Sequence, residues 1–362
     1  MTVVGYLKKN QLTFQESPSN IADALAVSWM AYFDFSIAKD RLPLKVSDFD
    51  YIHEYHTLEP YYSAFMPRFS RRFMKYMINS RRFSEAVLLE YEYVVDRAKG
   101  VQFAVIALKC DNDIIVAIRG TDPSYAGWKE DFTMSYKDTI SSYVLAESFV
   151  KRLLKKYKKG NIILCGHSKG GNICTYLLSS LEDVKRITHV YSFDGPGFRN
   201  TGLFAGKEDR LEKYTKIVPK SSVVGVLFSN ETDVKIVKSR SILLLQHNPF
   251  EWLIKDNDLI YVKKRSLSSH YLERSLNTWI ESLNHEDKER FTEIIFGELA
   301  KFEAGDISVF FRRLFLQVGP VWKAYRKLNK EDKEIVEKVI KSLIKSFIRP
   351  RKNPNNNKAI AA

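Results

Sequence analysis

Apolar and polar positions follow two different patterns along the chain. Before about residue 100 the pattern is helical: residues 20–32 form an almost continuous apolar run, which is typical of a buried helix, and Ser19 is a suitable cap for it. Residues 46–98 are rich in aromatic and arginine residues, and we expect more helix there. Residues 1–98 are therefore predicted to be a helical region packed on the core that follows.

From residue 101 the pattern changes to short apolar runs. Residues 101–108 and 114–118 are two such runs, and the Asp111-Asn112-Asp113 segment between them predicts a β-hairpin that enters a buried sheet. Helical segments are expected at 139–158 and 171–181. Further strand-like runs occur at 161–165, 188–193, 216–218, 223–228, 234–237 and 242–245.

Strands that alternate with helices indicate a mainly parallel sheet covered by helices on both faces, so the fold class is α/β. We expect this core to span residues 99–264. The pattern is helical again over residues 265–348, which are predicted to be C-terminal helices added to the core. Residues 349–362 are basic and rich in Pro and Asn, and they are predicted to be a disordered tail.

Composition and charge narrow the location and the partners. The three cysteines form no C-x-x-C pair, the first residues lack the pattern of a signal peptide, and no run of 18 apolar residues occurs, so we expect a cytoplasmic protein. The formal net charge of +14 either attracts anionic partners, such as an anionic membrane surface contacted peripherally, or only keeps the protein soluble. No nucleic-acid-binding motif accompanies the charge, so no nucleic acid is expected as a partner.

One motif carries the chemistry. Gly166-His167-Ser168-Lys169-Gly170 has the form G-x-S-x-G, and it lies between an apolar strand and an apolar helix. A serine hydroxyl is a weak nucleophile, so it needs a base, an accessible position and donors for the oxyanion. A sharp strand-to-helix turn supplies the position, and the N–H of Lys169 supplies one donor. The sequence therefore predicts Ser168 as the nucleophile of a serine hydrolase.

A second segment follows the predicted 114–118 strand. Arg119-Gly120-Thr121-Asp122 stands where a loop can supply the second oxyanion donor, through the N–H or hydroxyl of Thr121. The alternative is a simple strand-end turn capped by Asp122. Trp128 and Asp131 come shortly after it. Residues 123–136 are expected to form either a short lid over an acyl pocket, with Trp128 as its wall, or a fixed segment with Trp128 in the core.

These two segments resemble the fungal-type (class 3) lipases. Their pattern is an apolar residue followed by R-G-T/S, then a Trp and an Asp, then G-H-S-x-G-G, which correspond here to residues 118–121, Trp128, Asp131 and residues 166–171. The match is closer to an uncharacterised bacterial family (a domain of unknown function) related to those lipases, which carries G-H-S-K-G-G-N. Segments like residues 192–198, 237–239 and 246–252 follow it in that family. The resemblance covers roughly residues 10–300.

The resemblance implies an α/β-hydrolase fold and a Ser-His-Asp triad, without a defined substrate. In these folds the acid and then the histidine follow the serine along the chain. His247 leaves the last strand-like run in a loop that can face Ser168, and it is the favoured base; His270 is the alternative, and His285 looks like a solvated helix-end residue. His167 is expected to point away from Ser168 and to be structural or to line the site.

Two aspartates compete for the acid. Asp233 lies between two strand-like runs and fourteen positions before His247, and the lipase resemblance favours it. Asp194 ends the 188–193 strand, so it would lie near Ser168 or shape the wall of the site in an Asx-type turn. The lipases usually have Gly where this chain has Asp194, so the choice between the two stays open at this point.

The predicted function is cleavage of an acyl ester or lipid ester through an acyl-enzyme intermediate. This chemistry needs no metal and no organic cofactor. One alternative keeps the same triad but transfers the acyl group or cleaves a thioester. Another is a protein without catalytic activity that binds a membrane or a partner on a hydrolase scaffold. The oligomeric state is not predicted by any feature of the sequence.

Overall fold

The computed structural model describes residues 1–49, 67–122, 124–200, 202–228, 234–299, 322 and 325–350. The helices are α1 (Val3–Lys9), α2 (Ile21–Met30), α4 (Pro67–Ile78), α5 (Tyr125–Thr133), α6 (Ser141–Lys156), α7 (Lys169–Ser180), α8 (Leu267–Ser282), α9 (His285–Leu299) and α12 (Lys330–Ile348). Short 3-10 helices are η1 (Ser36–Arg41), η2 (Val46–Phe49), η3 (Glu208–Lys213), η4 (Leu243–His247) and η5 (Pro249–Glu251).

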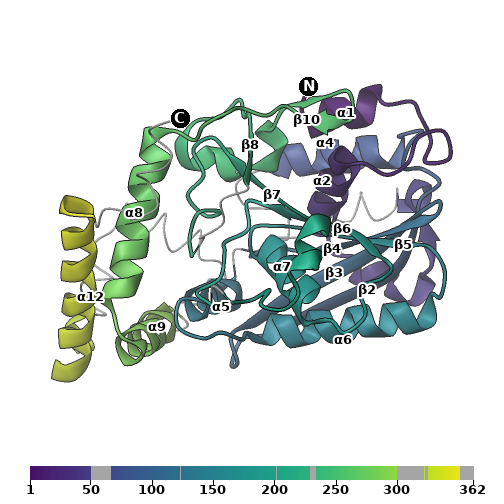
Figure 1. Ribbon diagram of the computed structural model, residues 1–362. Coiled ribbons are helices and arrows are strands. Elements are labelled where there is room, and N and C mark those ends of the chain that lie inside the picture. The colour runs from purple at the N-terminus through teal and green to yellow at the C-terminus, as the bar shows by residue number, and fades with distance from the viewer. Residues whose placement is uncertain are drawn as a thin grey trace.

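Eight strands form one sheet, in the order in which they occur in the chain (Figure 1). They are β1 (Leu44–Lys45), β2 (Val87–Asp96), β3 (Val101–Cys110), β4 (Asp113–Ile118), β5 (Asn161–His167), β6 (Ile187–Phe193), β7 (Tyr214–Pro219) and β8 (Val234–Val237). Pairs from β1 to β4 are antiparallel and pairs from β4 to β8 are parallel. The predicted β3–β4 hairpin and the mainly parallel α/β core are confirmed. A separate two-stranded ribbon is formed by β9 (Ile254–Lys255) and β10 (Asp258–Leu259).

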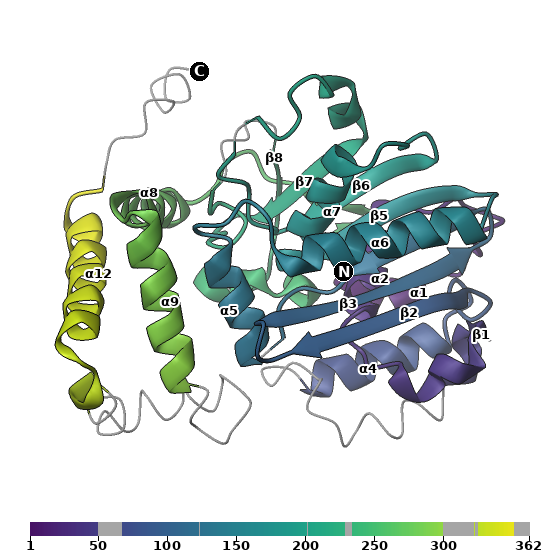
Figure 2. The same cartoon turned by 90° about the horizontal axis from the view of Figure 1, so that it is seen from below.

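Helices cover both faces of the sheet (Figure 2). Successive residues of β4 point to opposite faces: Ile115 and Ala117 pack with α1, α2 and α4, whereas Val116 and Ile118 pack with α6 and α7. This period of two explains why the strands read as continuous apolar runs, because a strand buried on both faces needs apolar side chains at every position. Each face is closed by one apolar cluster, and the sheet edge formed by the strand ends stays available for polar residues.

The structure corrects three expectations about single elements. Residues 87–96 form strand β2, not helix, and they pair with β3 over their whole length. Residues 223–228 form turns and not a strand. Ile242 precedes η4 and residues 243–245 form its first part; all four are exposed, so the apolar run there is not a buried strand. The predicted tail at 351–362 lies outside the described residues.

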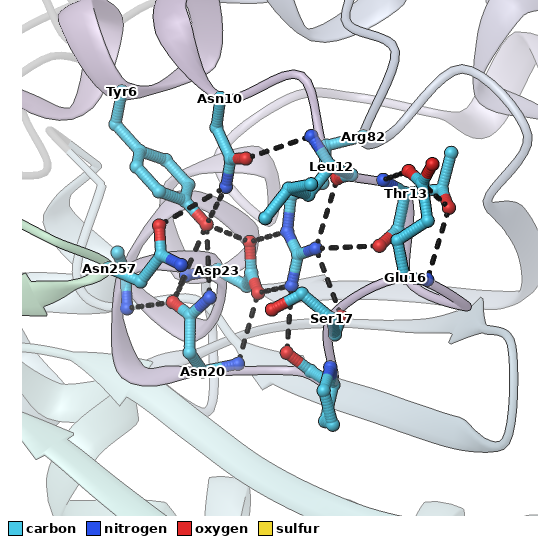
Figure 3. Close-up of polar contacts among 12 residues, drawn as sticks. Tyr6, Asn10, Leu12, Thr13, Glu16, Ser17, Asn20, Asp23, Arg82 and Asn257 are labelled. Carbon is cyan, nitrogen blue, oxygen red and sulfur yellow. Dashed lines mark hydrogen bonds and ion pairs between the residues drawn. The ribbon is translucent and has the colours of Figure 1, made fainter.

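A buried ion pair fixes the N-terminal helices to the core (Figure 3). Arg82 donates to both carboxylate oxygens of Asp23 in α2, at 2.7 and 2.5 Å, and its remaining N–H groups donate to the carbonyls of Leu12, Thr13, Ser17 and Pro18. Tyr6 of α1 donates to the same carboxylate at 2.7 Å. Because breaking a buried pair leaves an uncompensated charge, this cluster holds α2 firmly in place. The cap of α2 is Asn20, in a capping box with Asp23, rather than Ser19.

The C-terminal helices α8, α9 and α12 stand together at one side of the sheet in both views (Figures 1 and 2). Ion pairs join them, from Arg290 to Asp332 at 2.7 Å and from Lys338 to Asp287 at 2.6 Å. The group contacts the core through α9, whose Phe296 packs on α5. None of the described helices is long and apolar enough to cross a membrane.

Candidate active site

Ser168 stands at the turn between β5 and α7. Its backbone has φ 57° and ψ −130°, a conformation that residues with a Cβ rarely adopt. The turn is tight because the glycines beside it allow close backbone approach: a Cβ on Gly166 would lie 2.3 Å from the carbonyl carbon of Gly170, and one on Gly170 would lie 2.0 Å from the carbonyl oxygen of Ile118. The result is the strand–turn–helix elbow that the motif predicts, with Ser168 half-buried at its tip.

The carboxyl ends of three neighbouring parallel strands meet around Ser168. Gly120, the second residue after β4, lies so close that a Cβ on it would be 3.0 Å from the Cβ of Ser168. On the other side, the N–H of Ser168 donates to the carbonyl of Phe193, the last residue of β6, at 2.9 Å. Ligand sites of parallel sheets form at this edge, so the polar residues that follow β4, β5 and β6 gather where chemistry is expected.

Asp194 and His247 form a hydrogen-bonded pair at this edge. Nδ1 of His247 lies 2.7 Å from Oδ2 of Asp194. The Asp194 side chain is fully buried, and its other oxygen accepts from the hydroxyl of Ser222 at 2.5 Å and the N–H of Gly225 at 3.1 Å. A carboxylate that three neighbouring groups hydrogen-bond is held in one orientation. It can accept from His247 only if Nδ1 carries the proton, which leaves Nε2 free to accept one.

The carboxylate that lies on Nδ1 of His247 is thus that of Asp194, which the sequence offers as the alternative to Asp233. Asp233 lies outside the described residues. Asp194 reaches His247 because of its position in the sheet. It directly follows β6, which pairs with the elbow strand β5, and its backbone turns with a φ of 50°. The Nδ1–H group of His247 can form one hydrogen bond, and Asp194 already accepts it.

The other downstream histidines lie elsewhere. Nδ1 of His270, in α8, lies 3.1 Å from Arg265 and 3.6 Å from Glu273. His285, at the start of α9, stacks edge-on against Tyr136. Neither contacts Ser168 or Asp194 in the described part of the chain, so only His247 of the three candidates is brought to the elbow.

His167 links the elbow to the loop of His247. Its Nε2 lies 2.8 Å from the carbonyl oxygen of His247, and the two imidazole rings are 4.5 Å apart. Its Nδ1 accepts from the hydroxyl of Tyr32 at 2.9 Å, because a carbonyl on Nε2 requires the proton there. Burial, and then the neighbouring His247, hold the pKa of His167 well below its usual range. His167 is therefore a neutral imidazole that links Tyr32 to the loop of His247.

Tyr32 is a site residue that sequence reasoning missed. Besides donating to His167, its hydroxyl accepts from the N–H of Gly120. It joins α2, the elbow and the loop after β4 in one chain of hydrogen bonds. Tyr32 ends the apolar 20–32 run, and nothing in that pattern distinguishes a packing tyrosine from one that braces a site.

The candidate oxyanion donors differ in whether their hydrogen atoms are already used in another hydrogen bond. The hydroxyl of Thr121 donates to the carboxylate of Asp131, at 2.7–2.8 Å, so it is not available. The N–H of Thr121 forms no hydrogen bond to the described residues, and the N–H of Lys169 is at the first position of α7, where no intrahelical partner exists. Lys169 directly follows Ser168, and Thr121 directly follows Gly120, which lies against Ser168. Burial raises the pKa of Asp131 to about 6.

The side chain of Lys169 serves a different purpose from its N–H. Its ammonium is buried and donates to Glu130 at 2.7 Å and to the carbonyl of Gln102 at 2.8 Å. Glu130 also accepts from the N–H and hydroxyl of Ser142, at 3.0 and 2.7 Å. The pair ties α5, α6 and β3 to the elbow helix. Glu130 was not singled out by the sequence, because an acid inside an amphipathic segment reads as a solvated residue.

Trp128 lies on α5 within a small apolar cluster. Tyr125, Phe132 and Ile295 share this cluster with Trp128, and Phe296 of α9 is its buried centre. The segment 123–136 thus contains a short helix, which is anchored through Glu130 on one side and packed on α9 on the other. Its role as a lid stays a proposal. Among the residues that the structure describes, no group of three or more His, Cys, Asp or Glu side chains could hold a metal ion.

A family model described as Mbeg1-like matches residues 77–297, more than half of the chain. The chain belongs to the Mbeg1-like family. The matched residues contain the elbow, Asp194 and His247, and the resemblance to a lipase-like α/β-hydrolase family is confirmed. A search of curated proteins found no match.

The Mbeg1-like chain is also similar to solved lipase structures, at low identity. Lipase II from Rhizopus niveus is 15% identical, over 60% of this chain and 78% of that chain, with a TM-score of 0.37. A lipase from Rhizopus microsporus var. chinensis is 14% identical, over 60% and 71%, with a TM-score of 0.34. A mutant form of MDLA from Penicillium cyclopium is 10% identical, over 66% and 83%, with a TM-score of 0.38. The mainly parallel eight-stranded sheet and the elbow after β5 give this chain the α/β-hydrolase fold.

Proposed function

We propose that this Mbeg1-like protein is a serine hydrolase that cleaves carboxylic esters through an acyl-enzyme intermediate. The observation that carries the proposal is the strained backbone of Ser168 at the strand–turn–helix tip, next to the His247–Asp194 pair. A residue held at an unfavourable φ costs free energy, of order 1–3 kcal/mol, and such strain concentrates at functional sites. A nucleophile elbow supplies a reason for it, whereas a structural turn would favour glycine at this position.

The proposed first step is attack by Ser168 Oγ on the ester carbonyl carbon. Nε2 of His247 accepts the hydroxyl proton, and Asp194 stabilises the imidazolium through Nδ1–H. The N–H groups of Lys169 and Thr121 donate to the oxyanion, and loss of one such donor typically costs about 10²–10³-fold in kcat. The imidazolium then returns its proton to the departing alcohol, which leaves the acyl group on Ser168.

In the second step water attacks the acyl-enzyme. His247 again accepts a proton, this time from the water, and returns it to Ser168 Oγ as the carboxylic acid leaves. The side chain of His247 is 32% exposed, so water has access to the base, while Asp194 behind it is fully buried. A solvent-exposed base in front of a buried acid supports a role in hydrolysis over a purely structural His–Asp contact.

The substrate class is inferred from the resemblance to lipase-like proteins. It is an acyl ester, and the resemblance favours the ester of a lipid. The free, buried state of Cys110, Cys165 and Cys174 supports a reducing, cytoplasmic location. The proposal is tested by a screen of p-nitrophenyl esters of increasing acyl length and of phospholipids. We expect hydrolysis of at least one ester class by the wild-type protein, and none by Ser168→Ala.

Transfer of the acyl group to an added alcohol or thiol, faster than to water, would move the activity to an acyltransferase. Absence of turnover with every ester, together with unchanged folding, would contradict the hydrolase assignment.

A further inference from the structure

Four consecutive aliphatic side chains are exposed immediately before the proposed base. Ile242, Leu243, Leu244 and Leu245, here called the apolar loop, are between 55% and 69% exposed. Leu267, at the start of α8, is 87% exposed. Single exposed aliphatic residues are common on protein surfaces, but a contiguous group of them is typical of a surface that binds a protein, a membrane or a ligand.

The apolar loop is held in this exposed position by its neighbour Gln246, whose side chain is buried. Its amide oxygen accepts from the N–H of Ser221 at 2.7 Å, and its amide nitrogen donates to the carbonyl of Ser241 at 2.7 Å. The indole of the buried Trp252 donates to the carbonyl of Gln246 at 2.7 Å. The backbone on both sides of the loop is thus fixed, so the four aliphatic side chains project from a built turn and not from a frayed segment.

Leu267 belongs to the same surface. The hydroxyl of Ser221, whose N–H binds Gln246, lies 3.0 Å from the hydroxyl of Ser266, and the N–H of Ser266 donates to the carbonyl of Lys220 at 2.8 Å. The short segment 220–221 therefore joins the apolar loop to the first turn of α8. Five exposed aliphatic side chains then gather around one loop connection.

Cations flank this group. Arg240 comes two positions before Ile242, Lys263 and Lys264 precede Leu267, and Lys220 lies in the connecting segment; all four are exposed. None of them forms an ion pair in the described part of the chain, whereas Arg265 is bound to Glu273 at 2.6 Å. These four cations are therefore available to an anionic partner.

We propose that the apolar loop and Leu267 dock on the surface of an anionic lipid bilayer, with the flanking cations on the lipid head groups. A second copy of this chain is the weaker occupant, because a symmetric contact would bring the same cations face to face. An anionic bilayer instead accepts aliphatic side chains between its head groups and attracts lysine and arginine around them. Docking would place His247, two positions after the loop, at the lipid surface.

This inference rests on the proposed function only for its consequence, that the ester substrate lies in the lipid layer. Binding itself is measured on Ser168→Ala, so that vesicles stay intact. The protein is sedimented with vesicles of phosphatidylcholine alone and with vesicles that contain about one-third phosphatidylglycerol. We expect binding to the anionic vesicles, and binding to the neutral vesicles that is weaker by about tenfold or more.

Two pairs of substitutions in the Ser168→Ala background separate the contributions. Leu243→Ser with Leu244→Ser should weaken binding to anionic vesicles about tenfold or more, since two leucines that would insert into the bilayer are lost. Lys263→Gln with Lys264→Gln should weaken it about tenfold and remove its salt dependence in part. The matched control is Ile340→Ser with Ile344→Ser, at aliphatic positions of α12 that are 47% and 54% exposed, which should bind like the parent. Thermal unfolding checks that each variant is folded.

Three results would overturn the proposal. The first is that the Ser168→Ala parent binds neither vesicle type, and the second is that the α12 control loses as much binding as the loop variant. The third is that the parent is a dimer and the loop variant a monomer. Hydrolysis of a soluble short-chain ester by the wild-type chain is measured separately. If the soluble ester is cleaved but vesicles are not bound, the docking proposal fails and the hydrolase proposal stands.

Discussion

Nδ1 of His247 lies 2.7 Å from Oδ2 of Asp194, although 53 positions separate them in the chain. The contact joins the end of β6 to the loop after β8, and it stands beside the elbow of Ser168. A buried carboxylate that fixes the tautomer of a half-exposed imidazole is the arrangement that a general base needs. The predictions below follow from this contact and from the groups around it.

Replacing Asp194 by Asn should leave the fold intact and lower kcat for ester hydrolysis about 10³–10⁴-fold, because an amide can hold His247 in the wrong tautomer. Steady-state kinetics on the best ester of the screen give the number. Asp233→Asn is the matched control, at the position that the sequence favours for the acid, and we expect it to keep most of the activity. The opposite ranking of the two variants would return the acid to Asp233.

Replacing His247 by Ala should lower kcat about 10²–10⁴-fold or more, the range that loss of a general base produces. His270→Ala removes the competing downstream histidine, whose ring is bound at Arg265, and it should leave kcat within a few-fold of wild type. Both are measured with the same soluble ester, after circular dichroism has shown that they fold. Equal losses in the two variants would show that the assay reports stability and not the base.

Much of this site could be read from the sequence. Ser168 was predicted from the five motif residues between an apolar strand and an apolar helix. His247 was predicted from its place after the strand-like run at 242–245, although that run is not a strand. The acid could not be assigned, because Asp194 and Asp233 both stand beside predicted strands, and the choice depends on which strand neighbours β5. That adjacency is a property of sheet order, which apolar patterns do not encode.

Other parts were hidden for a different reason. Strand β2 carries Glu90 and Glu92 among its apolar residues, so its half-buried pattern resembles the helices around it in sequence. The apolar run at 242–245 has the composition of a buried strand, yet it is exposed. Tyr32 and Glu130 act through long-range hydrogen bonds, and a residue type alone does not show a partner far away in the chain.

The buried pair of Lys169 and Glu130 predicts a large stability effect. Lys169→Met should lower the free energy of unfolding by about 3–5 kcal/mol, because Glu130 is left buried without its partner. Replacing both, Lys169→Met with Glu130→Leu, should recover part of the loss. Urea unfolding followed by circular dichroism measures the difference. A single variant as stable as wild type would mean that the pair is hydrated and not buried.

Asp131 predicts a dependence of stability on pH. Burial raises its pKa to about 6 in the folded protein, whereas an unfolded aspartate has a pKa of about 3.9. Between these values the folded chain holds a proton that the unfolded chain has lost, so this group makes stability fall as pH rises from about 4 to about 6.

Asp131→Asn should therefore gain stability relative to wild type over that window, on the order of 2 kcal/mol. The free energy of unfolding is measured at several pH values for both proteins. Asp138→Asn, at an exposed position seven residues after Asp131, is the control, and its free energy of unfolding should follow that of wild type across the pH range. A wild-type curve parallel to that of Asp131→Asn would show that Asp131 titrates normally.

The central claim is that Ser168 is an activated nucleophile. It is tested most directly by treating the folded protein with a fluorophosphonate probe and locating the adduct by mass spectrometry. We predict one adduct, on the peptide that contains Ser168, which is absent in Ser168→Ala and strongly slowed in His247→Ala. Folded wild-type protein that stays unlabelled, or labelling that persists in Ser168→Ala, would contradict it.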